Sequence, residues 1–392
     1  GATGGVGGSG AGGRIAVIYN TVSQAAAGNP GVRMQTAAGT TGRRLGQEGT
    51  VYLPNTQFLS TTLEKQLFRN VRLYIPGFTS WSPASLTVNR CSLTFGEPGF
   101  VLTVPGNTIL NQGGLGLSGN FRFNCGGKVT LTNSSSLSLY SGITNGANPV
   151  YGGLMAVTGM IDVATGCWIY PYSDTTNGGS VKVAAGEVRV SSGGGINADG
   201  KGYVLNRGPG KGDDGGSYGG GAGYGGYGAT RNSGKTRGNV YGTLSAPAAP
   251  GSGGGHANLG GTGGSLIWLH VPTGIVWVAG TLTANGENAY STHGGGGAGG
   301  GIYLNCRRLE GASTGQLAAR GGQGDNGGGP GGGGRIAVVY NTVEQAGYNP
   351  GVKFDTSRGT AGYNKTAGRD SEDGTLYLPD KSFLSDTISG GM

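Results

Sequence analysis

Side chains that could do acid–base chemistry are scarce in this sequence. The chain of 392 residues contains 19 Asp and Glu and three His, namely His256, His270 and His293. Hydrolysis of a glycan needs two convergent carboxylates, and no expected strand carries two of them at alternate positions. The acidic residues at 213–214 and 370–373 fall in expected loops. The pattern therefore predicts no catalytic residue and no enzyme, with a remote carbohydrate-active enzyme as the alternative.

Nucleotide, metal and cofactor sites are not indicated either. The stretch GATRNSGKTRG, from Gly228, places five residues between its first glycine and Gly-Lys-Thr, whereas a phosphate-binding loop has four. The four cysteines, Cys91, Cys125, Cys167 and Cys306, form no CxxC motif and no cluster with His. They are either small buried residues or the partners of one or two disulfides in an exported protein, and the sequence leaves the connectivity open.

A glycine- and tyrosine-rich stretch is the main candidate for ligand contact. Residues 210–238 interleave glycine with three tyrosines and several cations. Aromatic rings on a glycine backbone suit sugar faces and subunit interfaces. The net charge is +8, but the Lys and Arg residues form no contiguous basic block, so nucleic acid is not predicted as a partner. The candidate contact residues of this loop are Tyr218, Tyr224, Tyr227, Arg231 and Lys235.

The elements that would position these residues are expected to be β-strands. Glycine supplies 91 of the 392 residues, charged residues only 12%. Alternating runs such as FVLTVPG and FRFNCGGKVTLTN, within residues 86–190, predict short strands. Short strands, regular Gly and Asn turns and a repeat of about 20–35 residues favour an all-β parallel β-helix, or solenoid, with glycine-rich loops. A β-sandwich or a string of small β-domains is the alternative.

The glycine tracts and the hydropathy profile give two further expectations. Tracts 290–301 and 321–334 are expected to be partly ordered, packed backbone to backbone, and residues 207–240 are expected to be mobile. No run of 18 apolar residues occurs, so no membrane span is predicted. The chain opens inside a repeat, with no initiator Met or signal peptide, which predicts a processed product or a fragment.

The same phrase occurs near both ends of the chain. GGRIAVIYNT, ending at Thr21, returns as GGRIAVVYNT, ending at Thr342, and YLP followed by Phe-Leu-Ser closes both copies. Copies this close predict one duplicated structural unit. The expected divisions are an N-terminal repeat copy (1–63), a strand-rich solenoid core (64–190), a glycine-rich repeat region with surface loops (191–332) and a C-terminal repeat copy (333–392).

The glycine-rich part resembles a known sequence type. The order glycine tract, GGGIYL, LEG, LAAR-GG, glycine tract and GGGGRIAVVYN is similar to the Gly-rich repeats of exported bacterial surface proteins. The resemblance covers about 195–345 and 1–20. It implies a β-helical fold, an extracellular or cell-surface location and a structural or adhesive role. It supplies no catalytic residue.

The end repeats predict self-assembly. A solenoid coil that lacks its neighbour exposes strand edges, and such edges recruit another chain. We expect the C-terminal copy of one subunit to stack on the N-terminal copy of the next, as in a homopolymeric filament. The candidate interface residues are Arg14, Tyr19, Tyr52, Arg335, Tyr340 and Tyr377. The alternative is a monomeric cell-surface adhesin that binds surface glycans through its Tyr/Gly-rich loops.

Overall fold

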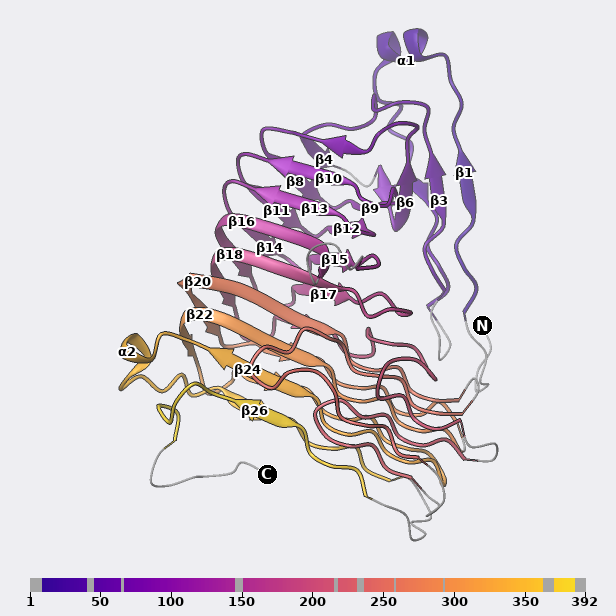
Figure 1. Ribbon diagram of the computed structural model, residues 1–392. Helices are drawn as coiled ribbons and strands as arrows, with labels where there is room; N and C mark the ends of the chain where they lie inside the picture. Colours follow the sequence, from indigo (N-terminus) through magenta and orange to yellow (C-terminus); the bar gives the residue numbers. More distant parts are fainter. Residues whose placement is uncertain are drawn as a thin grey trace.

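The computed structural model describes residues 9–40, 46–64, 67–144, 151–214, 218–230, 236–256, 259–291, 293–361 and 370–384. Within these ranges the chain is a parallel β-solenoid, as its sequence predicts (Figure 1). Two large sheets of 11 and 13 strands run along it, and strands that are neighbours in a sheet come from successive coils. The alternative of a β-sandwich is wrong, because the paired strands are parallel rather than joined as hairpins.

The eleven-stranded sheet forms one side of the solenoid and contains one short strand from each coil. Among the described residues, its first strand, β1, and its last, β25, each pair with a strand on one side only. In spatial order the strands are β1 (Arg14–Ala16), β3 (Thr50–Tyr52), β6 (Val71–Tyr74), β9 (Ser92–Phe95), β12 (Gly114–Ser118), β15 (Ser136–Tyr140), β17 (Trp168–Tyr172), β19 (Gly195–Asn197), β21 (Thr281–Thr283), β23 (Gln316–Ala318) and β25 (Lys353–Asp355).

The thirteen-stranded sheet starts as two separate rows that merge. One row is β4 (Thr62–Glu64), β8 (Leu86–Asn89), β11 (Thr108–Asn111) and β14 (Val129–Thr132); the other is β7 (Ser80–Trp81), β10 (Val101–Val104) and β13 (Arg122–Cys125). Both rows pair with the long strand β16 (Tyr151–Val163). The stack continues through β18 (Ser180–Val190), β20 (Leu266–Val278), β22 (Gly301–Gly311), β24 (Arg335–Val339) and β26 (Thr375–Tyr377). Each early coil therefore has three faces.

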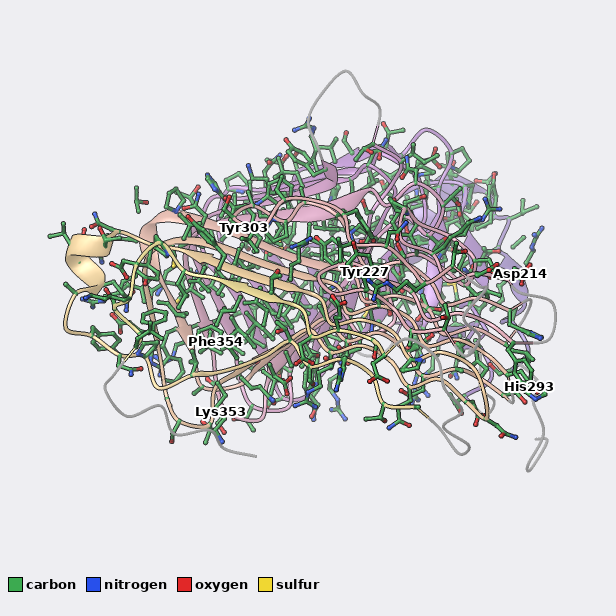
Figure 2. The ribbon with its side chains drawn as sticks, turned by 60° about the horizontal axis from the view of Figure 1, so that its bottom comes forward. Asp214, Tyr227, His293, Tyr303, Lys353 and Phe354 are labelled. Carbon is green, nitrogen blue, oxygen red and sulfur yellow. The ribbon has the colours of Figure 1, made fainter. Side chains whose placement is uncertain are left out.

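The remaining elements lie at the two ends of the solenoid. A two-stranded sheet pairs β2 (Met34–Gln35) with β5 (Phe68–Arg69). The short helices α1 (Thr21–Ala27) and α2 (Thr342–Gln345) occupy equivalent places in the two repeat copies. Viewed towards the C-terminal end, Tyr303 of the thirteen-stranded sheet and Lys353 of the eleven-stranded sheet lie on opposite sides of the molecule (Figure 2).

Stacked side chains hold the coils together. Alternate residues of each strand point inward, so one apolar column runs through paired positions of successive coils. Its members, all fully buried, include Val88, Leu110, Leu131, Val163, Val190 and Val278. At a corner, the Asn111 amide donates to Asn89 and the Asn133 amide donates to Asn111, each pair 22 residues apart. This ladder marks a coil of 22 residues in the early part of the solenoid.

Corners of the early coils use left-handed backbone. Asn70, Arg90, Gln112 and Asn133 each follow a strand or lie between two strands, with φ between 49° and 55°. Asn is among the residues that adopt this conformation most readily. These corners separate the inward-facing strands, so the chain turns from one face of the coil to the next.

A bundle of glycine segments packs beside the long strands. We call segments 219–228, 251–255, 260–264, 294–300 and 328–334 the glycine bundle; they run side by side at the lower right of Figure 1. Their backbones bond to one another: Ala222 N–H donates to the carbonyl of Gly296 at 3.0 Å, Gly296 N–H to Gly329 at 2.9 Å, and Gly254 N–H to Gly261 at 2.9 Å. The bundle thus satisfies its buried amides without regular sheet.

The expectation of a mobile stretch at 207–240 is wrong for residues 219–230. That segment is buried inside the glycine bundle, with Tyr224 fully buried at its centre. Glycine has no side chain to bury, so backbone hydrogen bonds replace side-chain packing as the source of order. The tracts at 294–301 and 328–334 are ordered as expected.

Candidate functional site

The two repeat copies fold alike at the level of side chains. The Tyr19 hydroxyl donates to Asn55 Oδ1 at 2.7 Å, and its ring lies 5.2 Å from that of Phe58. In the second copy the Tyr340 hydroxyl donates to Asp380 Oδ1 at 2.7 Å, with its ring 5.0 Å from that of Phe383. The pairs are equivalent in sequence, so each copy is the same structural unit.

Each copy also starts a short helix with an asparagine cap. Asn20 accepts a hydrogen bond from Ser23 N–H at the start of α1. Asn341 accepts from Val343 and Glu344 N–H at the start of α2. An Asn side chain at this place satisfies amides that the helix leaves unpaired, which explains why Tyr-Asn-Thr is common to both copies.

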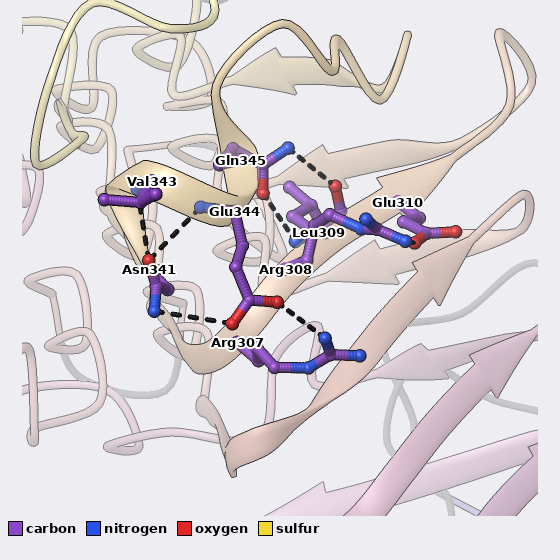
Figure 3. Close-up of polar contacts among 8 residues, drawn as sticks. All are labelled: Arg307, Arg308, Leu309, Glu310, Asn341, Val343, Glu344 and Gln345. Atoms are coloured by element: carbon purple, nitrogen blue, oxygen red, sulfur yellow. Dashed lines mark hydrogen bonds and ion pairs between the residues drawn. The ribbon is translucent and has the colours of Figure 1, made fainter.

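The C-terminal copy is covered by the coil that precedes it. Strand β24 pairs with β22 on one edge and with β26 on the other. Gln345, fully buried, accepts a hydrogen bond from Leu309 N–H and donates one to the Leu309 carbonyl (Figure 3). Glu344 forms an ion pair with Arg307 on the same neighbouring coil. Strand, helix and loop of this copy are all bound to the coil before them.

The N-terminal copy exposes the surface that corresponds to this covered one. Strand β1 has the sequence of β24 but pairs with β3 alone among the described residues. Ile18 is 83% exposed and Val32 is 57% exposed, whereas their counterparts Val339 and Val352 are partly buried. Gln24, the counterpart of Gln345, donates to the carbonyl of Gly28 in its own helix. The open face of the first copy is therefore apolar.

The opposite face is open in the other copy. In the N-terminal copy β3 pairs with β6, and Val51 of β3 is fully buried. In the C-terminal copy the equivalent strand, β26, pairs with β24 alone among the described residues, and Leu376 is 42% exposed. Leu384 is 65% exposed, whereas Leu59 packs against the core. Among the described residues, no strand pairs with the outer edge of β1 or with the outer edge of β26, and these two open faces complement each other.

The structure divides the candidate interface residues into two groups. Arg335 and Tyr340 lie inside the molecule: the Arg335 guanidinium donates to the Tyr241 carbonyl at 3.0 Å and to Thr375 Oγ1 at 3.1 Å. Both side chains are therefore engaged within the chain itself. Arg14 is exposed on β1 and Tyr52 is 40% exposed.

Tyr19 and Tyr377 are half-buried. The sequence did not lead to a prediction of the apolar residues on the open faces. Ile18, Val32, Leu376 and Leu384 belong to the repeated motif, but so do counterparts that are covered. The available signal was the repeat itself, because a side chain that is covered in one copy marks a position that can be covered in the other.

The described part of the glycine- and tyrosine-rich stretch places its three tyrosines in different surroundings. Tyr224 is fully buried, and the Arg335 guanidinium lies 5.5 Å from the centre of its ring. Tyr227 is covered by the Arg237 guanidinium, 3.7 Å from its ring centre. Tyr218 packs edge-on against His293. Arg231 and Lys235 lie outside the described residues.

The cysteines are buried and unpaired, so the disulfide interpretation is wrong. Cys91, Cys125, Cys167 and Cys306 are all free thiols. They sit at inward positions of different coils, where they pack as small apolar groups. Burial raises the pKa of Cys91 to about 11 and that of Cys306 to about 12, which keeps the reactive thiolate form rare at neutral pH.

An open groove crosses the outer face of the thirteen-stranded sheet where its strands bend. It has a volume of about 570 Å³, and Thr103, Asn124 and His270 are among the residues that line it. Burial, with the charge of Lys182, lowers the pKa of His270. No carboxylate lines this groove, so it offers no pair of acids for hydrolysis.

Two further properties concern the described residues alone. Within the ranges given above, no three His, Cys, Asp or Glu side chains gather where they could hold a metal ion. In the same part of the chain, neither helix has the length and apolar character needed to cross a membrane.

Comparison with known proteins adds no relative. No family profile, no curated protein and no solved structure matches this chain.

Proposed function

We propose that the protein is a structural subunit that assembles end to end into an extracellular filament or surface appendage. The observation that carries this proposal is the complementarity of the two repeat copies. The face that is open in one copy is covered by a neighbouring coil in the other. A second molecule can therefore place a coil against each open face, as a neighbouring coil of the same chain does in the other copy.

The chemistry of the open faces supports association. Unpaired strand edges bind further strands through main-chain hydrogen bonds. The exposed Ile18, Val32, Leu376 and Leu384 add apolar area, and each such side chain contributes about 1.5–3 kcal/mol when fully buried. The Arg-Ile-Ala sequence can pair on both edges, because β24 does so.

A heterologous contact of this kind does not close on itself, and repetition produces a fibre. Low charge content and a backbone-bonded glycine bundle suit a dense structural fibre. The likeness to Gly-rich repeats of exported bacterial surface proteins supports the location outside the cell. The burial of Tyr224 argues against the glycan-binding alternative through this loop.

The first prediction concerns Leu376 on the open edge of β26. Leu376→Lys places a charge where the next coil should cover the side chain, so filaments should be lost while the monomer stays folded, because Leu376 is already 42% exposed. Negative-stain electron microscopy across a concentration series, with circular dichroism to check folding, measures both.

The matched control is Val343→Lys. Val343 and its counterpart Val22 are 83% and 79% exposed, so this position stays uncovered in both copies. This variant should form filaments like the unmodified protein. Single rods at every concentration for the unmodified protein, or filaments of Leu376→Lys indistinguishable from those of the control, would contradict the proposal.

A further inference from the structure

The two copies lie on different faces of the solenoid. Strands β1 and β3 of the first copy belong to the eleven-stranded sheet, whereas their counterparts β24 and β26 belong to the thirteen-stranded sheet. Strand β25 belongs to the eleven-stranded sheet, and its counterpart β2 pairs with β5 outside both large sheets. The duplicated unit is thus shifted around the coil by one face between the two ends.

This shift creates two candidate junctions at the open edge of β1. In one, the eleven-stranded sheet continues from β25 of one subunit into β1 of the next, since both are its edge strands. In the other, β26 at the edge of the thirteen-stranded sheet pairs with β1. The two junctions differ in how one subunit is rotated relative to its neighbour.

Side-chain positions favour the second junction. Ile15 and Phe354 are the central residues of β1 and β25, so aligning them sets Lys353 opposite Arg14, and like charges placed directly opposite destabilise a strand pair. In the second junction, the last strand of one repeat copy, β26, is followed by the first strand of the other copy, β1. Arg14 then lies opposite the neutral Thr375, on the edge of β26 that does not pair with β24.

The same register places the other two residues of β1 next to suitable partners. Ile15 meets Leu376, an apolar residue that pairs with Ile336 on the other edge of β26. Ala16, already paired with Tyr52, meets Tyr377, and Ala337 likewise pairs with Tyr303 and Tyr377. In this register no residue of β1 faces a like charge, and Ala16 lies between two tyrosines as Ala337 does.

We infer that β26 of one subunit pairs in parallel with β1 of the next, with Arg14 opposite Thr375, Ile15 opposite Leu376 and Ala16 opposite Tyr377. This inference rests on the proposed function. The thirteen-stranded sheet of one subunit runs into the eleven-stranded sheet of its neighbour. Each subunit is therefore turned about the filament axis by one face of the solenoid, and the filament is helical.

Cysteine crosslinking distinguishes the two junctions. Adjacent parallel strands lie about 4.8 Å apart, inside the Cα separation of about 4.4–6.8 Å that a disulfide spans. The four native thiols are buried and do not interfere. The test variant carries Arg14→Cys and Thr375→Cys; the control carries Ala16→Cys and Asp355→Cys, a pair that the first junction sets opposite each other and that keeps the charges of Arg14 and Lys353. Under mild oxidation, the test variant should give a ladder of covalent oligomers on a non-reducing gel, and the control should stay monomeric.

A second pair and an independent measurement guard against loss of assembly in these variants. Ala16→Cys with Tyr377→Cys should give the same ladder, and helical reconstruction of unmodified filaments should show a rotation per subunit.

Three outcomes overturn the inference. A ladder from the control, or filaments without rotation, shows that the eleven-stranded sheet continues. Filaments that crosslink through neither pair show a different junction, while the proposed function survives. If the unmodified protein forms no filaments, both this inference and the proposed function are wrong.

Discussion

At the scale of single residues, the two copies differ most informatively at one position. Asn55 in the first copy and Asp380 in the second accept the same hydrogen bond from a tyrosine hydroxyl. Hydrogen bonds from Tyr340 and from Ser382 N–H hold the pKa of Asp380 below its ordinary value. One copy therefore has a neutral acceptor and the other a charged one, in otherwise similar geometry.

This difference predicts an acid sensitivity confined to the C-terminal copy. A carboxyl whose pKa is lower in the folded state stabilises the fold above its unfolded pKa of about 3.9, and that contribution is lost as the pH falls through the folded value. The pKa of Asp355 is also lowered in the folded state. Burial raises this pKa, but the hydrogen bonds from Ser357 and Arg320 outweigh the effect of burial.

Asp380→Asn converts the site into the Asn55 version. The variant should lose the stabilising contribution of the Asp380 carboxylate at pH 7, and it should lose less further stability between pH 4 and pH 2 than the unmodified protein, as measured by urea denaturation at each pH. An equal loss in both proteins would show that the Tyr340–Asp380 pair does not report on acid stability.

At the scale of elements, the glycine bundle depends on the absence of side chains. A Cβ on Gly225 would lie 1.9 Å from the carbonyl oxygen of Gly334, and a Cβ on Gly295 would lie 2.0 Å from that of Gly220. Backbone atoms of neighbouring segments cannot move aside as a flexible side chain can. The density of glycine here is therefore a requirement of close backbone approach.

The substitution Gly225→Ala tests that requirement. We expect a loss of about 1–3 kcal/mol or more in the free energy of unfolding, from overpacking against fixed backbone. Gly10→Ala is the matched control, because nothing lies within 4 Å of its added Cβ. The control should be neutral or slightly stabilising. Equal stability of the two variants in chemical denaturation would mean that the bundle is not close-packed.

At the scale of the whole molecule, the repeated Arg-Ile-Ala sequence provides an internal comparison. Strand β24 is paired on both edges and β1 on one. In hydrogen exchange, amides of β24 should be protected in monomer and filament alike, because that strand is closed within one chain. Those amides of β1 and β26 that face the open edges should become protected only on assembly. Protection of β1 that is unchanged by assembly would place the junction elsewhere.

Much of the architecture follows from local patterns. Alternation in FVLTVPG and FRFNCGGKVTLTN predicts strands, and β10, β13 and β14 occur there. The helix at Thr21–Ala27 was not predicted, although Asn20 stands at its start as the cap. The 22-residue Asn ladder was present in the sequence as Asn89, Asn111 and Asn133 and went unrecognised, since a single Asn per coil is a weak signal until the coils are aligned.

The sequence by itself determined that the chain is a β-solenoid with a duplicated unit at its ends, because side-chain alternation and repetition are local properties. Only the tertiary structure decided which face of the coil each copy occupies and which of its edges stays open. It also decided that Tyr224 and Arg335 are buried and that the cysteines are unpaired. These outcomes depend on pairing between distant coils and on backbone contacts among glycines, and neither leaves a trace in the neighbouring residues.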